Sequence, residues 1–346
     1  MNQILSKIER ANTEKSTLLS LSNQGLTDIP IEVFELEHLT NLNLRDNKIQ
    51  SIPKEISRLK NLKVLYLDGN NIKELPVEFF ELENIKILNI DNNSLKFLPE
   101  NIGNLKQLKR LHFSQNDLNE IPKTIGNLSN LEHLFGHSNR ILNLPKEVGY
   151  LKKLTQLNFF NNQIQNFDFN LSQLTELEYL ELGINAIERV SKTIGVLKKL
   201  KILSLFDNAL KSVPVELNSL EELTKLNLSY NSLKEIDFDL SSMKKLSELH
   251  IFANEELKLK KLDIIEICNR TPDYPNHSRL IIDQTQESLI EEFRRKIESS
   301  KIGIVDLDKK RMPEDHYNQI PIELSEKYKL TDPRLDKFRM LREKIK

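Results

Sequence analysis

Asparagine recurs every 23 residues through most of the chain, without one insertion or deletion between successive copies. The ten positions in register are Asn47, Asn70, Asn93, Asn116, Asn139, Asn162, Asn185, Asn208, Asn231 and Asn254. One step before the first of them stands Gln24, whose side chain ends in the same amide group. A fixed period of this length is typical of repeat proteins, in which each repeat stacks on the next. The length of 346 residues is therefore a poor guide to the number of domains.

The leucines around each asparagine keep the same period and define one repeating unit. In one copy, Leu62, Leu65 and Leu67 precede Asn70, and Ile72 follows it by two positions. The two leucines nearer the asparagine indicate a short strand, in which both point inward and the residue between them points outward. The asparagine stands where the chain leaves this strand, and its amide can satisfy backbone groups that a turn leaves unpaired.

A proline often stands six residues after the asparagine, within the return segment, by which we mean the stretch from each asparagine to the next strand. These prolines are Pro30, Pro53, Pro76, Pro99, Pro122, Pro145 and Pro214. Proline fixes its own backbone angle and lacks an N–H, so it sets the direction of the return. No single unit can bury its leucines, but eleven stacked units make a continuous core. Their strands, about 4.8 Å apart, should form one parallel sheet on the inside of a curved stack.

The pattern LxxLxLxxNxLxxIPxxIxxLxx, as in LKVLYLDGNNIKELP and LTKLNLSYNSLKEID, resembles the leucine-rich repeat. Its 23-residue form with IP after the turn is similar to the cytoplasmic Ras-suppressor and Roco-type repeats. The resemblance covers about residues 16–262. It implies an α/β fold, a leucine-rich-repeat horseshoe solenoid with a parallel sheet on its concave face. It also implies protein recognition on that face, although a fold alone does not fix a function.

Both ends of an open solenoid need caps, because otherwise the terminal leucines face water. Residues 1–15 place Ile4, Leu5, Ile8 and Ala11 on one side of a helix and predict an N-terminal capping helix over 2–14. Residues 263–346 lose the period and are expected to form a C-terminal cap or a small α/β extension. Within that extension we expect strands over 279–283 and 301–307, and helices over 285–300 and 331–345. The last helix is basic; it either contacts a partner or lipid, or docks on the cap with a solvated face.

Four residues depart from the repeat pattern. Gly136 replaces the second strand leucine, which leaves a hole in the core unless a neighbouring side chain fills it. Asp168, Ser191 and Asp237 stand where proline is expected. We expect looser return segments in those three repeats.

Composition excludes several classes of protein. There are 50 Lys and Arg against 51 Asp and Glu, whereas nucleic-acid-binding domains usually carry a basic excess. No apolar run is long enough to span a membrane, and residues 1–15 are too charged for a signal peptide. A single cysteine, Cys268, fits a reducing compartment. We expect a cytoplasmic protein, with an effector exported without a cleaved signal peptide as the alternative. The sequence indicates no particular oligomeric state.

Motifs for catalysis are missing from the sequence. It contains no phosphate-binding GxxxxGK, HExxH, paired CxxC or GxSxG. Some bacterial leucine-rich-repeat effectors carry a ubiquitin-ligase domain with a catalytic cysteine, but no base accompanies Cys268, and a buried structural role fits it better. Roco-type relatives add a GTPase domain, which this chain lacks. We therefore expect a non-catalytic adaptor or inhibitor without cofactors; the alternative is an enzyme whose activity lies in residues 263–346.

The secure register identifies the outward positions of the concave face, and we predict that a protein partner binds there. The candidate partner-binding residues are His112, His133, Phe135, His137, Phe160, Tyr179, Phe206, Tyr230 and Phe252, together with Asp68 and Asp91. Large exposed aromatic side chains are typical hot spots of protein interfaces. Asp68 and Asp91 favour basic groups on the partner.

Phenylalanine and small residues alternate along one column of this face. Phe160, Phe206 and Phe252 should stand about 10 Å apart, since every second strand is about 9.6 Å away, with Gly183 and Ser229 between them. Such ridges and gaps suit side chains inserted by a partner. In the alternative interpretation, the rings lie flat on one another and stabilise the sheet.

The histidines of this face do not predict a metal site. His133 and His137 lie on one strand about 13 Å apart, too far to share a metal ion. Protonation of these histidines below about pH 6.5 should instead place positive charge among the aromatic rings.

Overall fold

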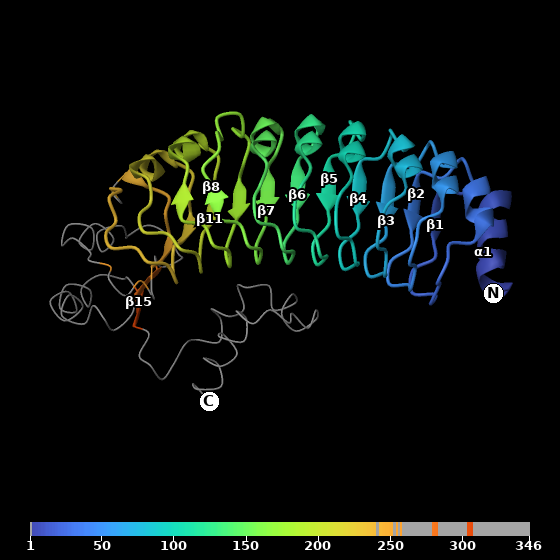
Figure 1. Cartoon of the computed structure of the whole chain (residues 1–346), viewed down its shortest axis with the longest axis horizontal. Coiled ribbons are helices and arrows are strands. Elements are labelled where there is room, and N and C mark those ends of the chain that lie inside the picture. The colour runs from blue at the N-terminus through green and yellow to red at the C-terminus, as the bar shows by residue number, and fades with distance from the viewer. Residues whose placement is uncertain are drawn as a thin grey trace.

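The chain forms a solenoid that bows into an arc, in the computed structural model shown in Figure 1. The structure describes residues 2–239, 242–251, 254, 257, 279–282 and 303–306. Strands lie side by side along the arc, short helices line its outer edge, and one longer helix closes the N-terminal end (Figure 1). This arrangement is the horseshoe expected from the 23-residue period, with the sheet on the concave side.

Thirteen parallel strands within the described residues form the main sheet. The first eleven are β1 (Leu18–Ser20), β2 (Asn41–Asn43), β3 (Val64–Tyr66), β4 (Ile87–Asn89), β5 (Arg110–His112), β6 (His133–Phe135), β7 (Gln156–Asn158), β9 (Tyr179–Glu181), β11 (Ile202–Ser204), β12 (Lys225–Asn227) and β13 (Glu248–His250). Within these eleven, each residue pairs with the one 23 positions later, as Leu42 does with Leu65. The expected register is confirmed.

Two further strands extend this sheet beyond the regular repeats. They are β14 (Arg279–Ile282), which pairs with β13, and β15 (Gly303–Asp306), which pairs with β14. They fall within the strands expected over 279–283 and 301–307. The helices expected over 285–300 and 331–345 lie outside the described residues, as does Cys268.

Short 3₁₀ helices occupy most return segments. They are η1 (Ile31–Glu35), η2 (Lys54–Arg58), η3 (Val77–Glu81), η4 (Glu100–Asn104), η5 (Lys123–Asn127), η6 (Lys146–Tyr150), η7 (Lys192–Val196) and η8 (Val215–Ser219). Proline precedes each of them except η7. Ser191 precedes η7 and accepts a hydrogen bond from the backbone N–H of Thr193, so a side-chain cap replaces the proline.

The expectation of looser return segments is correct for one repeat and wrong for another. No helix follows Asp168, where β8 (Asn166–Phe167) instead pairs with β10 (Arg189–Val190) of the next repeat. The Ser191 repeat, in contrast, keeps its helix. After Asp237 only Phe238 and Asp239 are described before a gap, and neither is helical.

The strand leucines and the apolar residues of the return segments form one continuous core. At Gly136, phenylalanines from the two neighbouring repeats fill the space of the missing side chain. A Cβ at this position would overlap the rings of Phe113 and Phe159. These two rings lie 6.1 Å apart across the glycine, so the core has no hole here.

Each asparagine satisfies backbone groups of two repeats. Asn116 donates through Nδ2 to the carbonyl oxygens of Ile90 and Phe113, and its Oδ1 accepts from the N–H of Leu95. Gln24 cannot repeat this pattern because no repeat precedes it, and its amide donates to nearby carbonyls instead. The predicted role of the asparagine ladder is confirmed.

Helix α1 (Asn2–Thr13) closes the N-terminal end, as the apolar stripe predicted. Ile8 and Ala11 are buried, and Ile4 and Leu5 pack partly against the core. Among the described residues, no helix is both long and apolar enough to cross a membrane.

Candidate functional site: the concave face

Four columns of outward side chains run along the concave face, because successive repeats pair in register. The last column, which we call the turn column, directly precedes the asparagine ladder and has a left-handed backbone. Its members are Asn23, Asp46, Gly69, Asn92, Gln115, Ser138, Asn161, Ile184, Asp207 and Tyr230, with φ between 50° and 71°. Asparagine, aspartate and glycine tolerate this conformation, whereas β-branched isoleucine rarely adopts it. Ile184, with φ 53°, is therefore strained.

Ile184 lies within a cluster of rings, which we call the aromatic cluster: Phe160, Ile184, Phe206 and Tyr230. The rings of Phe160 and Phe206 are stacked with centroids 6.1 Å apart, and Tyr230 meets Phe206 edge-on at 6.4 Å. Phe160 and Phe206 are only 6% and 7% exposed. Tyr230 is half-buried.

The predicted ridges and gaps are wrong at this place. The Phe206 ring lies where a side chain on Gly183 would stand, so the glycine makes room for a neighbouring ring and not for a partner. The centroid distance of 6.1 Å is accordingly much shorter than the expected 10 Å. For Phe160 and Phe206 the geometry matches the alternative interpretation, in which the rings stabilise the sheet. Phe252 lies outside the described residues.

A buried carboxylate beside the aromatic cluster was missed by the sequence prediction. Glu181 Oε1 accepts a hydrogen bond of 2.8 Å from the N–H of Gly183. Burial raises the pKa of Glu181 to about 7, although hydrogen bonds from Gly183, Ser204 and Tyr179 oppose this shift. The pKa of the Tyr179 hydroxyl is raised by burial and by the nearby Glu181. The available signal was an acidic residue between the two strand leucines, Leu180 and Leu182.

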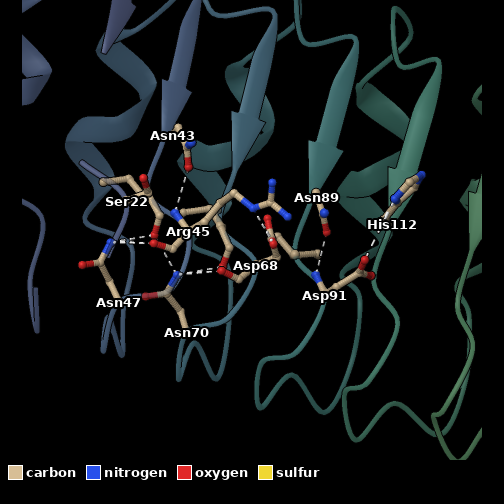
Figure 2. Close-up of polar contacts among 12 residues, drawn as sticks. Ser22, Asn43, Arg45, Asn47, Asp68, Asn70, Asn89, Asp91 and His112 are labelled. Carbon is tan, nitrogen blue, oxygen red and sulfur yellow. Dashed lines mark hydrogen bonds and ion pairs between the residues drawn. The ribbon is translucent and has the colours of Figure 1, made fainter. Parts of the chain in front are cut away.

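A polar region occupies the other half of the face, around β3 to β6. Arg45 Nε lies 2.7 Å from Asp68 Oδ2 (Figure 2). The Arg45 guanidinium also lies over the ring of Tyr66. Asp68 thus has a cation from its own chain, which the sequence prediction did not anticipate. Its pKa is nevertheless raised, because burial outweighs the attraction of Arg45.

Asp91, the next acid along, has a different environment. Its Oδ1 accepts a hydrogen bond of 2.5 Å from the N–H of Ser114, and its Oδ2 lies 4.0 Å from His112 Nδ1 (Figure 2). The Asp91 side chain is 26% exposed, and protein covers the rest of it. Burial therefore raises the pKa of Asp91 to about 7.

The histidines and Phe135 form a stack on β5 and β6. The rings of His112 and Phe135 are 4.5 Å apart, and those of Phe135 and His133 are 5.8 Å apart. Burial and the charges of His133 and Arg110 lower the pKa of His112 to about 4. Burial and His112 lower the pKa of His137 to about 4 as well.

The predicted switch of the histidines near pH 6.5 is therefore wrong for His112 and His137. Burial penalises their charged forms, so both rings stay neutral well below neutral pH. The groups with a pKa near 7 on this face are the carboxyls of Asp91 and Glu181. In the part of the chain that the structure describes, no three His, Cys, Asp or Glu side chains are grouped to hold a metal ion.

Several buried polar atoms of this face have no hydrogen-bond partner. They are Asp68 Oδ1, His112 Nε2, Ser114 Oγ, Gln115 Nε2 and Asn161 Oδ1. Only three such atoms lie elsewhere among the described residues, on His38, Glu147 and Glu216. Among the described residues, buried polar atoms without hydrogen-bond partners are thus concentrated on the concave face.

Two family models match the chain. Residues 85–189 match the leucine-rich repeat region, and residues 17–72 and 175–233 match the leucine rich repeat. No curated protein sequence matches significantly.

Solved structures share the architecture. The functional domain of InlJ from Listeria monocytogenes, which includes a cysteine ladder, is 26% identical with a TM-score of 0.62, covering 77% of this chain and 59% of that one. The ectodomain of the plant membrane receptor kinase GASSHO1/SCHENGEN3 from Arabidopsis thaliana, in complex with CASPARIAN STRIP INTEGRITY FACTOR 2, is 28% identical with a TM-score of 0.67, covering 78% and 33%. A TDR receptor is 25% identical with a TM-score of 0.62, covering 77% and 52%. The chain spans less than two thirds of each of these structures.

Proposed function

Because the chain is a leucine-rich-repeat protein, we propose that it is a non-catalytic adaptor or inhibitor whose protein partner binds the concave face. Leucine-rich repeats are generally protein–protein interaction modules. The GASSHO1/SCHENGEN3 ectodomain, which has the same repeat architecture, is in complex with CASPARIAN STRIP INTEGRITY FACTOR 2. These likenesses support the proposal but name no partner for this chain.

One observation carries the proposal: five of the eight buried polar atoms without partners, among the described residues, lie on the concave face. A buried polar group without a hydrogen bond costs about 1–3 kcal/mol, and native proteins contain few of them. Their concentration on this face favours it as the place where a partner supplies polar groups. The half-buried Phe135 stack beside them offers apolar area to the same partner.

The proposal is tested by affinity capture from cells that produce the protein, with matched aromatic variants. Phe135→Ala removes a ring from the concave face, whereas Tyr150→Ala removes an exposed ring from η6 on the outer edge. We expect a protein retained by the wild type and by Tyr150→Ala to be lost with Phe135→Ala. Melting temperatures equal to that of the wild type would show that both variants are folded. If both variants retain the same proteins as the wild type, the concave face is not the binding site.

We also propose that the protein acts in the cytoplasm and belongs with the Ras-suppressor and Roco-type repeats. A single cysteine in 346 residues and a uniform 23-residue period, with an aliphatic residue and proline after most turns, support this assignment. Cell fractionation should find the protein in the cytosolic fraction, protected from protease added to intact cells. Its recovery from the culture medium would favour an exported effector instead.

A further inference from the structure

Two carboxylates, Asp68 and Asp91, follow neighbouring strands of the concave face, and one cation, Arg45, is paired with the first of them. Asp68 and Asp91 hold the same position in successive repeats, and the strands β3 and β4 that precede them pair in register. Neighbouring strands are about 4.8 Å apart, so the two acids lie close enough to repel each other. Arg45 is paired with Asp68. Among the described residues, no lysine or arginine forms an ion pair with Asp91.

His112 does not supply the missing positive charge. Its Nδ1 is 4.0 Å from Asp91 Oδ2, which is too long for a hydrogen bond. Burial, together with the charges of His133 and Arg110, keeps the pKa of His112 near 4, so the ring is neutral at physiological pH. Asp91 therefore faces a neutral imidazole.

The residues on either side of Asp91 each have a buried side-chain oxygen without a hydrogen-bond partner. Asp68 and Ser114 occupy the same column one repeat before and one repeat after Asp91, and they are 8% and 0% exposed. Asp68 Oδ1 and Ser114 Oγ have no hydrogen-bond partner. Each can accept a hydrogen bond, and the Asp91 carboxylate between them remains accessible to solvent. The oxygen acceptors of Asp68 and Asp91 thus lie next to each other in one column, and among the described residues no lysine or arginine is paired with Asp91.

The charge of the whole face agrees with this local deficit of positive charge beside Asp91. Its outward positions within residues 18–251 carry six acids and three bases: Asp46, Asp68, Asp91, Glu181, Asp207 and Glu248 against Arg45, Arg110 and Lys225. Two of the bases are already paired, Arg45 with Asp68 and Lys225 with Glu248. A partner of complementary charge would be basic at this place.

We propose that Asp68 and Asp91, with Ser114 beside them, form a socket for an arginine side chain of the protein partner, an inference that rests on the proposed function. A guanidinium carries five N–H donors in one plane and a permanent charge, so it can serve several oxygen acceptors at once. The neighbouring stack of His112, Phe135 and His133 offers flat rings against which a guanidinium can pack. A lysine ammonium matches neither the spread of acceptors nor the rings.

The socket is tested directly with N-acetyl-arginine methylamide, added to the isotope-labelled full chain and followed by NMR. We expect concentration-dependent shifts of the backbone amides of Asp91, His112 and Ser114. The neutral isostere N-acetyl-citrulline methylamide should give none, and N-acetyl-lysine methylamide should bind more weakly. Equal shifts from the arginine and citrulline compounds would overturn the proposal.

Two isosteric variants provide the controls. Asp91→Asn should raise the dissociation constant of the arginine compound at least tenfold. Glu181→Gln removes another buried carboxyl with a pKa of about 7, but one already satisfied within the chain, and should leave the constant unchanged. Unchanged binding by Asp91→Asn, in a protein whose spectrum is otherwise that of the wild type, would also overturn the socket.

Binding should also weaken as Asp91 takes up a proton. Arg45 and Asp68 face Asp91 from one side and His112 and Ser114 from the other, and of these His112 stays neutral. With a pKa of about 7, the ionised fraction of Asp91 falls about tenfold from pH 8 to pH 6, and the affinity should fall with it. A constant affinity across this range would contradict the socket.

The proposed function and the socket can be told apart. If the arginine compound does not bind while Phe135→Ala still abolishes partner capture, the proposed function stands and only the socket is wrong.

Discussion

At the scale of single residues, burial decides which groups of the concave face titrate near neutral pH. The sequence identified the histidines by residue type, since an unperturbed imidazole changes charge in this range. The fold instead lowers the pKa of His112 and His137 to about 4 and raises that of Asp91 and Glu181 to about 7. Burial depends on how the whole sheet curves, so residue type alone could not predict this exchange.

The carboxyl of Glu181 should make the protein more stable at mildly acidic pH than at pH 8. Its pKa is about 7 in the folded chain against an ordinary value of 4.5, so the folded state binds a proton that the unfolded state releases. This stabilisation is complete below about pH 4.5 and is lost as the pH rises to about 7. Glu181→Gln should therefore raise the free energy of unfolding at pH 8 relative to the wild type.

Urea unfolding at pH 5 and at pH 8 checks this prediction. The difference between Glu181→Gln and the wild type should be about 1 kcal/mol or more in favour of the variant at pH 8, and smaller at pH 5. The conservative variant Glu181→Asp keeps an acid and should keep the pH dependence. Parallel pH profiles for the wild type and Glu181→Gln would show that this carboxyl is ionised throughout.

Restoring the consensus leucine at position 136 should destabilise the protein. The rings of Phe113 and Phe159 fill the space beside Gly136, so a side chain at this position would overlap them. Overpacking of a filled core is costly, and for a whole leucine side chain we expect a loss of about 3 kcal/mol or more. Urea unfolding measures it. Phe113→Leu in the same chain should recover part of the loss, whereas a stabilising Gly136→Leu would reveal a hole in the core.

At the scale of the elements, the missing proline before η7 has a structural reason that the repeat pattern alone could not show. The backbone N–H of Ser191 donates a hydrogen bond to the carbonyl of Phe167, which continues the pairing of β10 with β8. Proline has no N–H and would lose this bond, although the φ of −58° at Ser191 would suit it. The serine hydroxyl then caps the helix in place of the proline.

Replacement of Ser191 by alanine or by the consensus proline should therefore destabilise the protein. Ser191→Ala removes the cap to Thr193, and Ser191→Pro removes the bond to Phe167, each at a cost of about 1 kcal/mol. Thermal or urea unfolding measures both. Ser191→Thr, which can keep the cap and the N–H, is the control and should stay close to the wild type. A stabilising Ser191→Pro would mean that the pairing of β8 with β10 contributes nothing.

At the scale of the whole molecule, the fold was predictable because one period fixes the register of every strand. The leucines, the asparagine ladder and α1 follow from residue spacing alone. The details of the face did not follow, because spacing ignores how side chains lean. Phe206 lies across Gly183, and Arg45 reaches Asp68 of the next repeat. Strain was equally hidden: the positive φ of Ile184 and Tyr230 is visible only once the turn column is known.

The most direct test of partner binding on the concave face is hydroxyl-radical footprinting of the chain alone and with its captured partner. Oxidation of each aromatic side chain, read by mass spectrometry, reports its exposure. Phe135 and Tyr230 face the concave side, whereas Phe97 and Tyr150, 49% and 48% exposed, lie on return segments. We expect the partner to lower the oxidation of Phe135 and Tyr230 and to leave Phe97 and Tyr150 unchanged. Protection of Phe97 and Tyr150 with no change at Phe135 and Tyr230 would contradict binding on the concave face.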